Sequence, residues 1–404
     1  MQRRHDIDAL RVIAFALLIL YHVGMVYVLD WDYHVKSSYQ VEWLQWPMIF
    51  INRWRMPLLF MISGIAIGLC QPLRAPLRFA LLRSWRLLLP LVFGMLFIVP
   101  IQAYCEATAH GSFAAGFGEF MTRYLQLRPW PEGGWTGAEH GVTWNHLWYL
   151  AYLWVYTLLL MPLLPLLGSA VGQRLQAGLC ARGNLALIGL PALLLFANLM
   201  LLQPRFPETH ALVGDWYLHV EYFSVFLCGY VIARSERFWQ RLQGLRWKTL
   251  VIALVAISIE LSLRAAGRYL PPEQLPATLA TVPWGAIERA ARALYLWSAL
   301  LAILGWGKAL LDRPFPWLRY ATEAVYPWYI LHQSLIVLIA FWLTPMRIGA
   351  VWEPALVLLG TVIGCLALHE LLIRRFNLLR VLFGLKWKPP IPGGGLASTS
   401  LPPA

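Results

Sequence analysis

One histidine of the chain stands where it could do acid–base chemistry. Arg11 and His22 lie in the same apolar stretch, eleven residues apart. That spacing is close to three helical turns, so both side chains face the same side of a helix. Asp8 lies one turn before Arg11 and is placed to pair with it. A buried imidazole can take and return a proton near neutral pH, as the activation of a hydroxyl group requires. The alternative is structural: a histidine that hydrogen-bonds a neighbouring helix.

Two pairs of arginines are candidate binding groups for anions. Arg83 and Arg86 are three residues apart, so they share a helical face on which two guanidinium groups form a fork for phosphate. Ordinary anchoring of a helix on the cytoplasmic side is the alternative. Arg53 and Arg55 fall on the outer side, where few cations are expected. They are predicted either to hold an acidic acyl or glycan group or to pair with the aspartates of the preceding loop. Pro57 follows shortly, and a helix can begin there.

Other polar and aromatic side chains are candidate contacts for a substrate. Trp130 and Trp135 lie in a segment rich in Gly and Pro, where indole rings could stack on sugars; an interfacial aromatic belt is the alternative. Three more polar residues lie in or at the start of apolar stretches: His146, Tyr222 and His332. They are predicted either to contact the substrate or to form hydrogen bonds between helices. The chain has no H-E-x-x-H, P-loop or G-x-S-x-G motif, and its five scattered cysteines form no C-x-x-C pair. The sequence therefore indicates no metal site.

The composition requires that membrane helices carry these residues. Of the 404 residues, 59% are apolar and 13% are charged, whereas an ordinary globular domain is about 25% charged. A soluble enzyme, a disordered protein and a disulfide scaffold are thereby excluded. The net charge of +13 is interpreted as basic cytoplasmic loops rather than as a surface for nucleic acid. The predicted fold class is an all-α polytopic membrane protein.

Ten apolar stretches approach the length of about 20 residues that a bilayer-spanning helix needs. Their approximate bounds are 9–28, 47–70, 87–105, 145–167, 185–203, 216–233, 249–266, 290–311, 321–344 and 352–373. If the N-terminus is inside, the inside segments hold twice as many Lys and Arg residues as the outside segments, so both termini are predicted to be cytoplasmic. We predict one membrane domain, residues 1–375, and a tail, 376–404, which is basic at first and disordered after residue 388.

Several spaced motifs resemble the membrane acyltransferase-3 family, and the resemblance covers nearly the whole chain. The motifs are Asp8-x-x-Arg11 with His22 after ten further residues, Arg83-x-x-Arg86, Phe60-x-x-Ser63-Gly64 and Tyr329-x-x-His332. Further segments are similar to the osmoregulated periplasmic glucan succinyltransferase group of that family: Tyr33-His34-Val35, Arg55-Met56, His146-Leu147-Trp148, Glu370 and Leu382-Phe383-Gly384-Leu385-Lys386. Glu221 departs from the pattern of that group, where an apolar or aromatic residue is expected.

The resemblance implies a multi-pass O-acyltransferase of the bacterial inner membrane. It implies that His22 is catalytic, with Arg11 and Asp8 on its face, and that Arg83 and Arg86 bind acyl-CoA, the donor substrate. The acceptor would be a periplasmic glucan on the outer side. Its expected contacts are Arg53, Arg55, His34, Trp130, Trp135, His146, Tyr222 and His332.

Succinyl-CoA is the favoured donor, because a guanidinium of the outer pair could hold a free carboxylate. We expect no bound metal and no nucleic-acid partner. Membrane lipid is expected to surround the chain, and a homo-oligomer is possible. The alternatives are an O-acetyltransferase of another surface polysaccharide and a glycan transporter. The roles of Glu221, Glu260 and Glu370 stay open.

Overall fold

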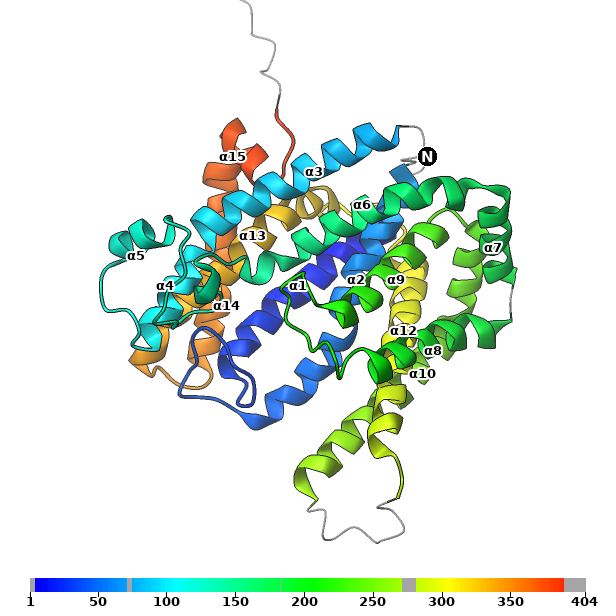
Figure 1. Ribbon diagram of the computed structural model, residues 1–404, viewed down its shortest axis with the longest axis horizontal. Helices are drawn as coiled ribbons and strands as arrows, with labels where there is room; N and C mark the ends of the chain where they lie inside the picture. Colours follow the sequence, from blue (N-terminus) through cyan, green and yellow to red (C-terminus); the bar gives the residue numbers. More distant parts are fainter. Residues whose placement is uncertain (1–3, 71–74, 182, 271–280, 389–404) are drawn as a thin grey trace, which may run out of the picture.

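The computed structural model describes residues 4–70, 75–181, 183–270 and 281–388. These residues form helices and loops, with one isolated β-bridge between Val28 and Val41 (Figure 1). The predicted disordered tail after residue 388 lies outside the described residues. The elements are α1 (His5–Tyr27), η1 (Glu42–Leu44), α2 (Gln45–Cys70), α3 (Pro76–Phe93), η3 (Gly94–Ile98), α4 (Pro100–Ala109), α5 (Phe117–Tyr124), η4 (Ala138–His140), η5 (Asn145–Leu147), α6 (Trp148–Gly168), α7 (Ala170–Ala181), α8 (Asn184–Leu201), α9 (Trp216–Ile232), α10 (Glu236–Tyr269), α12 (Trp284–Leu310), α13 (Leu318–Leu343), η7 (Thr344–Met346), α14 (Trp352–Leu368), η8 (His369–Ile373) and α15 (Asn377–Leu382).

Nine helical segments of the described chain are long and apolar enough to cross a membrane, where the sequence predicted ten. The stretch predicted at 216–233 forms α9, whose 17 residues extend about 26 Å. That length falls short of a hydrocarbon core of about 30 Å. The stretch predicted at 87–105 begins earlier, at Pro76, and continues through the π-helical turn η3 into α4.

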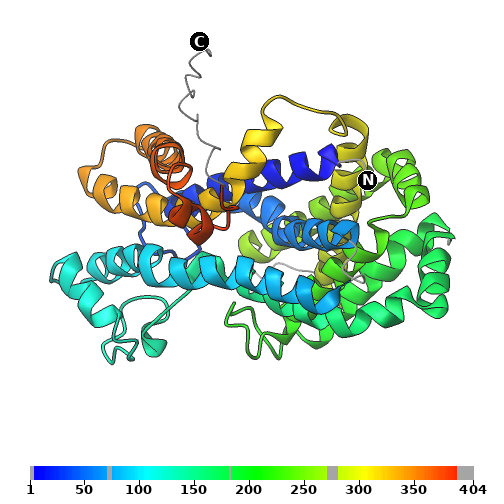
Figure 2. The same ribbon diagram turned by 90° about the horizontal axis from the view of Figure 1, so that it is seen from above.

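Two helices, α1 and α2, run through the middle of the bundle. On one side of them lie α3, α4, α13 and α14, and on the other α8, α10 and α12 (Figure 1). Turned by 90°, the molecule shows α3 and α4 along one outer edge (Figure 2). The pairs α1–α13, α1–α2 and α2–α9 are in direct contact. The polar residues of α1, α2 and α13 therefore meet in the interior.

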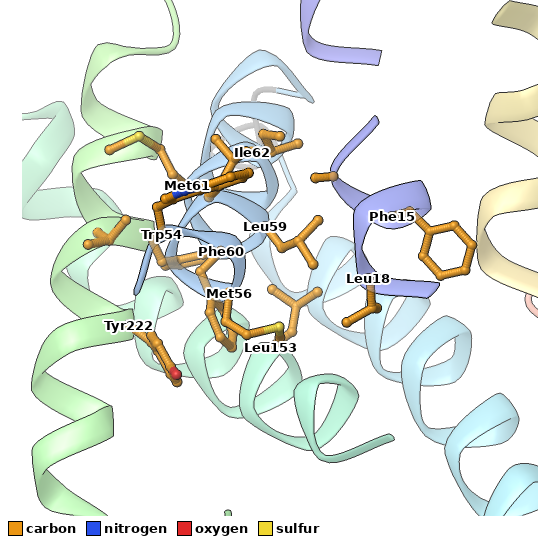
Figure 3. Packing of buried hydrophobic residues seen from close by; sticks show 14 of the residues in the cluster. Phe15, Leu18, Trp54, Met56, Leu59, Phe60, Met61, Ile62, Leu153 and Tyr222 are labelled. Carbon is orange, nitrogen blue, oxygen red and sulfur yellow. The ribbon is translucent and has the colours of Figure 1, made fainter. Parts of the chain in front are cut away.

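The backbones of α2 and α9 touch at glycines. A Cβ atom placed on Gly64 would lie 2.0 Å from the carbonyl oxygen of Phe226, and one on Gly229 would lie 2.3 Å from the carbonyl oxygen of Met61. Around this crossing, side chains of α1, α2, α6 and α9 interlock, with the fully buried Phe60 among them (Figure 3). The motif that contains Ser63-Gly64 thus serves a close helix–helix contact.

The two loop tryptophans do not form an exposed sugar platform, which corrects the prediction. Trp130 is 4% exposed and Trp135 is 5% exposed. They pack on one another, and their neighbours include Phe120 and Tyr124 of α5. The loop folds around this short helix and buries its own aromatic side chains, so the indole faces are covered by protein.

Arg53 is also placed differently from the prediction. Its guanidinium pairs with Glu260 of α10 at 2.6 Å, and Glu260 in turn accepts from Arg264 at 3.2 Å. Asp30, one of the predicted loop partners, pairs instead with Arg268 at 3.0 Å. Arg53 and Glu260 therefore form a buried ion pair that ties α2 to α10.

Candidate functional site

A cavity of about 570 Å³ lies among the middle helices and the loops on one face of the bundle. It brings together five of the predicted residues, from α1, α2, η5, α9 and a loop: His22, Arg55, His146, Tyr222 and His34. The three loop segments that contribute to it are 33–34, 136–146 and 208–211. Polar side chains from distant parts of the sequence thus share one cavity.

His22 is held by a second histidine, His332 of α13. The Nδ1 of His332 lies 2.7 Å from the carbonyl oxygen of Tyr329 and 3.2 Å from that of Trp328. Carbonyl oxygens only accept, so this nitrogen carries the hydrogen and the Nε2 of His332 is an acceptor. The Nδ1 of His22 therefore donates to that Nε2, over 3.0 Å. The lone pair of His22 is left on its Nε2, for which the described part of the chain shows no hydrogen-bond partner.

A buried carboxylate fixes the histidine of the first loop. The Nδ1 of His34 donates to Glu106 of α4 in a short hydrogen bond. The other oxygen of Glu106 accepts from the backbone and hydroxyl of Thr136, at 3.0 and 2.8 Å. The Nε2 of His34 accepts from the amide of Gln333 at 3.1 Å. The loop that carries His34 is thereby joined to α4 and α13.

Gln102 of α4 joins the remaining polar groups behind the cavity. Its Nε2 donates to the hydroxyl of Ser334 at 2.7 Å and to the Nδ1 of His146 at 3.2 Å. Its Oε1 accepts from Asn145 and Gln333, each at 3.1 Å. The Nε2 of His146 donates to main-chain carbonyls of α13 at 3.1 and 3.2 Å. Every hydrogen-bonding atom of the Gln102 amide is thus used inside the protein.

Arg55 is a cation in the cavity wall without an acidic partner among the described residues. The residue is 6% exposed, and its guanidinium lies 3.6 Å from the centre of the Tyr21 ring. Its hydrogen bond from Nη2 to Asn52 is long, at 3.4 Å, and the guanidinium also interacts with the side chain of Tyr21. The Nε and Nη1 atoms are buried without a partner there. A buried guanidinium in this state is ready to bind an anionic ligand.

Tyr33 adds a hydroxyl group to the same wall. It lies in the loop after α1 and lines the cavity, and its hydroxyl is buried without a partner in the described chain. Burial raises the pKa of Tyr33, and the nearby carboxylate of Glu106 raises this pKa further. The phenol therefore stays protonated at neutral pH and can donate a hydrogen bond into the cavity.

The loop before α9 closes another side of the cavity with residues in a left-handed backbone conformation. His210 has a φ of 56° and Leu212 one of 67°. The side chain of Asp215 holds this turn, because it accepts from the backbone N–H of His210 at 3.0 Å and from the Tyr152 hydroxyl at 2.5 Å. The Nε2 of His210 lies 3.1 Å from Glu208, and both residues line the cavity. The strained turn thus fixes a polar rim.

The predicted phosphate fork lies away from the cavity, beyond a set of aromatic rings. Arg83 lies near Arg11, Tyr149 and Tyr326, and its Nε is buried without a partner in the described chain. Arg86 is exposed, and its carbonyl oxygen accepts from the Tyr326 hydroxyl at 3.1 Å. The structure therefore brings Arg11 to the two arginines of α3; we name these three residues the basic cluster.

Three aromatic side chains separate the basic cluster from His22. Tyr329 lines the cavity and contacts Phe15 and Tyr149, at ring distances of 6.4 and 6.1 Å. Phe15 also packs edge-on against His332, and Tyr149 is near Arg83. We name Phe15, Tyr149 and Tyr329 the aromatic layer.

Some predicted residues do not reach the cavity. Asp8 and Arg11 form an ion pair of 3.8 Å near the start of α1. Glu221 accepts from the Tyr217 hydroxyl at 3.0 Å, and Glu370 pairs with Arg374 at 2.9 Å. These positions make structural contacts in the described chain.

Several polar residues of the site were missed, and three of them belong to helices. They are Gln102, Glu106 and Gln333. The available signal was a polar side chain inside an apolar helix, which is costly unless it is hydrogen-bonded.

The apolar helices and the histidine-lined cavity define a multi-pass α-helical membrane protein with a site suited to proton transfer. The family model described as an acyltransferase domain, acyltransferase 3, matches residues 4–370. The chain therefore belongs to the acyltransferase-3 family, which confirms the resemblance at that level and supports acyl transfer as its function. Neither a curated protein nor a solved structure matches the chain.

Proposed function

We propose that the chain transfers a succinyl group from succinyl-CoA to a hydroxyl group of a periplasmic glucan, in the bacterial inner membrane. The observation that carries the proposal is the hydrogen-bonded pair of His22 and His332 at the cavity. In the proposed reaction, the lone pair on His22 Nε2 takes the hydrogen of the glucan hydroxyl while the oxygen attacks the thioester carbon. The carbon–sulfur bond then breaks, and the departing sulfur receives that proton.

His332 positions His22 for this step. Because His332 accepts at Nε2, His22 keeps its hydrogen on Nδ1 and presents Nε2. When His22 is protonated, its Nδ1–H still donates to His332, so the contact persists through the reaction. The family assignment supports the acyl transfer, and the unpartnered Arg55 supports a donor with a free carboxylate.

The direct test is acyl transfer in vesicles that contain the full-length protein. Labelled succinyl-CoA is supplied on one side and a glucose oligosaccharide on the other. Label bound to the oligosaccharide, together with release of coenzyme A, is the expected result. A glycan exporter would move the oligosaccharide without cleaving the thioester, and that result would refute the proposal.

Arg55→Gln should reduce succinyl transfer while transfer of an uncharged acetyl group is kept or increased. The loss of charge-assisted hydrogen bonds costs about 1.5–3 kcal/mol, or roughly 10- to 150-fold in kcat/KM for succinyl-CoA. The measurement compares kcat/KM for succinyl-CoA and acetyl-CoA with one acceptor.

Arg53→Gln is the matched control for Arg55, because its ion pair with Glu260 is buried away from the cavity. It should affect both donors equally, through stability. An equal loss with both donors in Arg55→Gln would assign Arg55 a structural role, and a wild-type preference for acetyl-CoA would refute the succinyl assignment.

Arg83→Ala and Arg86→Ala should each raise the KM for acyl-CoA more than the KM for the glucan. We propose that the basic cluster holds the phosphates of coenzyme A, so each loss removes a charge-assisted contact worth about 1.5–3 kcal/mol, roughly 10- to 150-fold. The exposed Arg78 of the same helix provides the control, and Arg78→Ala should leave both constants unchanged. Unchanged donor KM in both variants would make Arg83 and Arg86 plain anchors of α3.

A further inference from the structure

The polar network behind the cavity leaves the Oε1 of Gln333 buried without a partner in the described chain. Gln333 is 4% exposed and lines the cavity. Acceptor-only oxygens fix the hydrogen positions at both ends of this network. At one end, His146 donates from Nε2 to the carbonyl oxygen of Tyr329; at the other, His34 donates from Nδ1 to Glu106. The direction of every hydrogen bond between these ends is thereby determined.

This direction also determines which way the Gln333 amide faces. Its Nε2 donates to the Nε2 of His34 and to the Oε1 of Gln102, each over 3.1 Å, and these bonds use both hydrogens. Turning the amide over would set its oxygen against the Oε1 of Gln102, which already accepts from Asn145 at 3.1 Å. Two acceptors would then face one another. The Oε1 of Gln333 is therefore held as an acceptor at the cavity wall.

The reacting end of the acyl donor cannot supply the hydrogen that this atom requires. A carboxylate and a thioester carry no donor group, and they match instead the unpartnered nitrogens of Arg55 and the hydroxyl of Tyr33. The attacking hydroxyl has a single hydrogen, which the proposed reaction gives to His22. The amide N–H groups of a pantetheine arm lie on the far side of the sulfur, toward the basic cluster, which leaves another group of the acceptor as the missing donor. His22 and Gln333 line the same cavity, so one acceptor molecule can contact both.

We infer that the Oε1 of Gln333 accepts a hydrogen bond from a second hydroxyl of the acceptor, adjacent to the one that is acylated. The inference rests on the proposed function and narrows the acceptor to a sugar with two neighbouring hydroxyls. One of them reacts at His22, and the other binds Gln333. An acceptor that lacks the second hydroxyl leaves a buried oxygen unpaired, which costs binding in the transition state.

The test compares a glucose oligosaccharide with its monodeoxy derivatives, using the full-length protein in vesicles with succinyl-CoA. With the wild type, one derivative that keeps the acylated hydroxyl should lose roughly tenfold in kcat/KM. Gln333→Met should lose a similar factor with the parent sugar and should no longer distinguish it from that derivative. The matched control is Ser334→Ala, which removes a bond to Gln102 outside the cavity lining and should keep the discrimination.

Two results would overturn the inference while the proposed function stands. One is equal acylation by the wild type of the parent and of every derivative that keeps the acylated hydroxyl, a measurement that requires no variant to fold. The other is unchanged discrimination by Gln333→Met. If the wild type acylates no sugar at all, the proposed function itself fails, and the inference fails with it.

Discussion

Replacing His22 by alanine should abolish acyl transfer while the protein stays folded and inserted. Because the Nδ1 of His22 donates to His332, the Nε2 of His22 carries the lone pair that can accept a proton at the cavity. General base catalysis contributes about 10²- to 10⁴-fold, so transfer to a glucan should fall to background. The measurement is transfer of label from succinyl-CoA, with folding checked by the thermal transition of the purified protein.

The control for His22 is another buried histidine, away from the cavity. His369 of η8 is fully buried, and it does not line the site. His369→Ala should therefore retain the activity of the folded fraction. Near-normal acylation by His22→Ala would show that His22 is not the catalytic base, whatever the control shows.

Gly64→Ala should be the most damaging small change in the helical core. The added Cβ would lie 2.0 Å from the carbonyl oxygen of Phe226, and backbone atoms cannot turn aside as a flexible side chain can. The helices must separate, which we expect to cost about 3 kcal/mol, the upper end for overpacking. The expected observation is a lower thermal transition and a smaller folded yield after membrane extraction.

Gly189→Ala is the matched control for this prediction. Gly189 lies in α8, and a Cβ atom there would meet no other atom within 4 Å. Alanine favours a helix over glycine by about 1 kcal/mol, so the thermal transition of this variant should stay the same or rise slightly. A Gly64→Ala protein as stable as Gly189→Ala would mean that α2 and α9 can separate without loss.

The class of the fold could be predicted from hydropathy alone, because a chain in lipid must satisfy its backbone hydrogen bonds within helices. The ends of the helices were harder to predict from the sequence. The second stretch was predicted at 47–70, with Pro57 as a possible helix start; α2 begins at Gln45 and runs through this proline. The missing donor of one proline is tolerated where packing holds the flanking turns.

The candidate site could be predicted only where one helix carries its own signal. His22 could be predicted because it is an ionisable residue inside an apolar helix, on the same face as Arg11. Gln102 and Gln333 carry no charge, and their meaning depends on a contact between α4 and α13 that no local pattern encodes. The error at Trp130 has the opposite origin. A Gly- and Pro-rich composition indicates a loop, but it does not show that the loop has a core of its own.

The aromatic layer has a consequence for the energised membrane in which such a chain would work. A protonatable histidine in a water-filled passage from one face to the other would conduct protons and dissipate the gradient. In this fold, Phe15, Tyr149 and Tyr329 stand between the cavity and the basic cluster. Moving one charge through such a barrier against 100 mV takes about 2.3 kcal/mol, besides the cost of stripping it of water. The same rings that pack against the histidine pair are therefore a barrier to proton leakage while no acyl donor occupies the route from the basic cluster to His22.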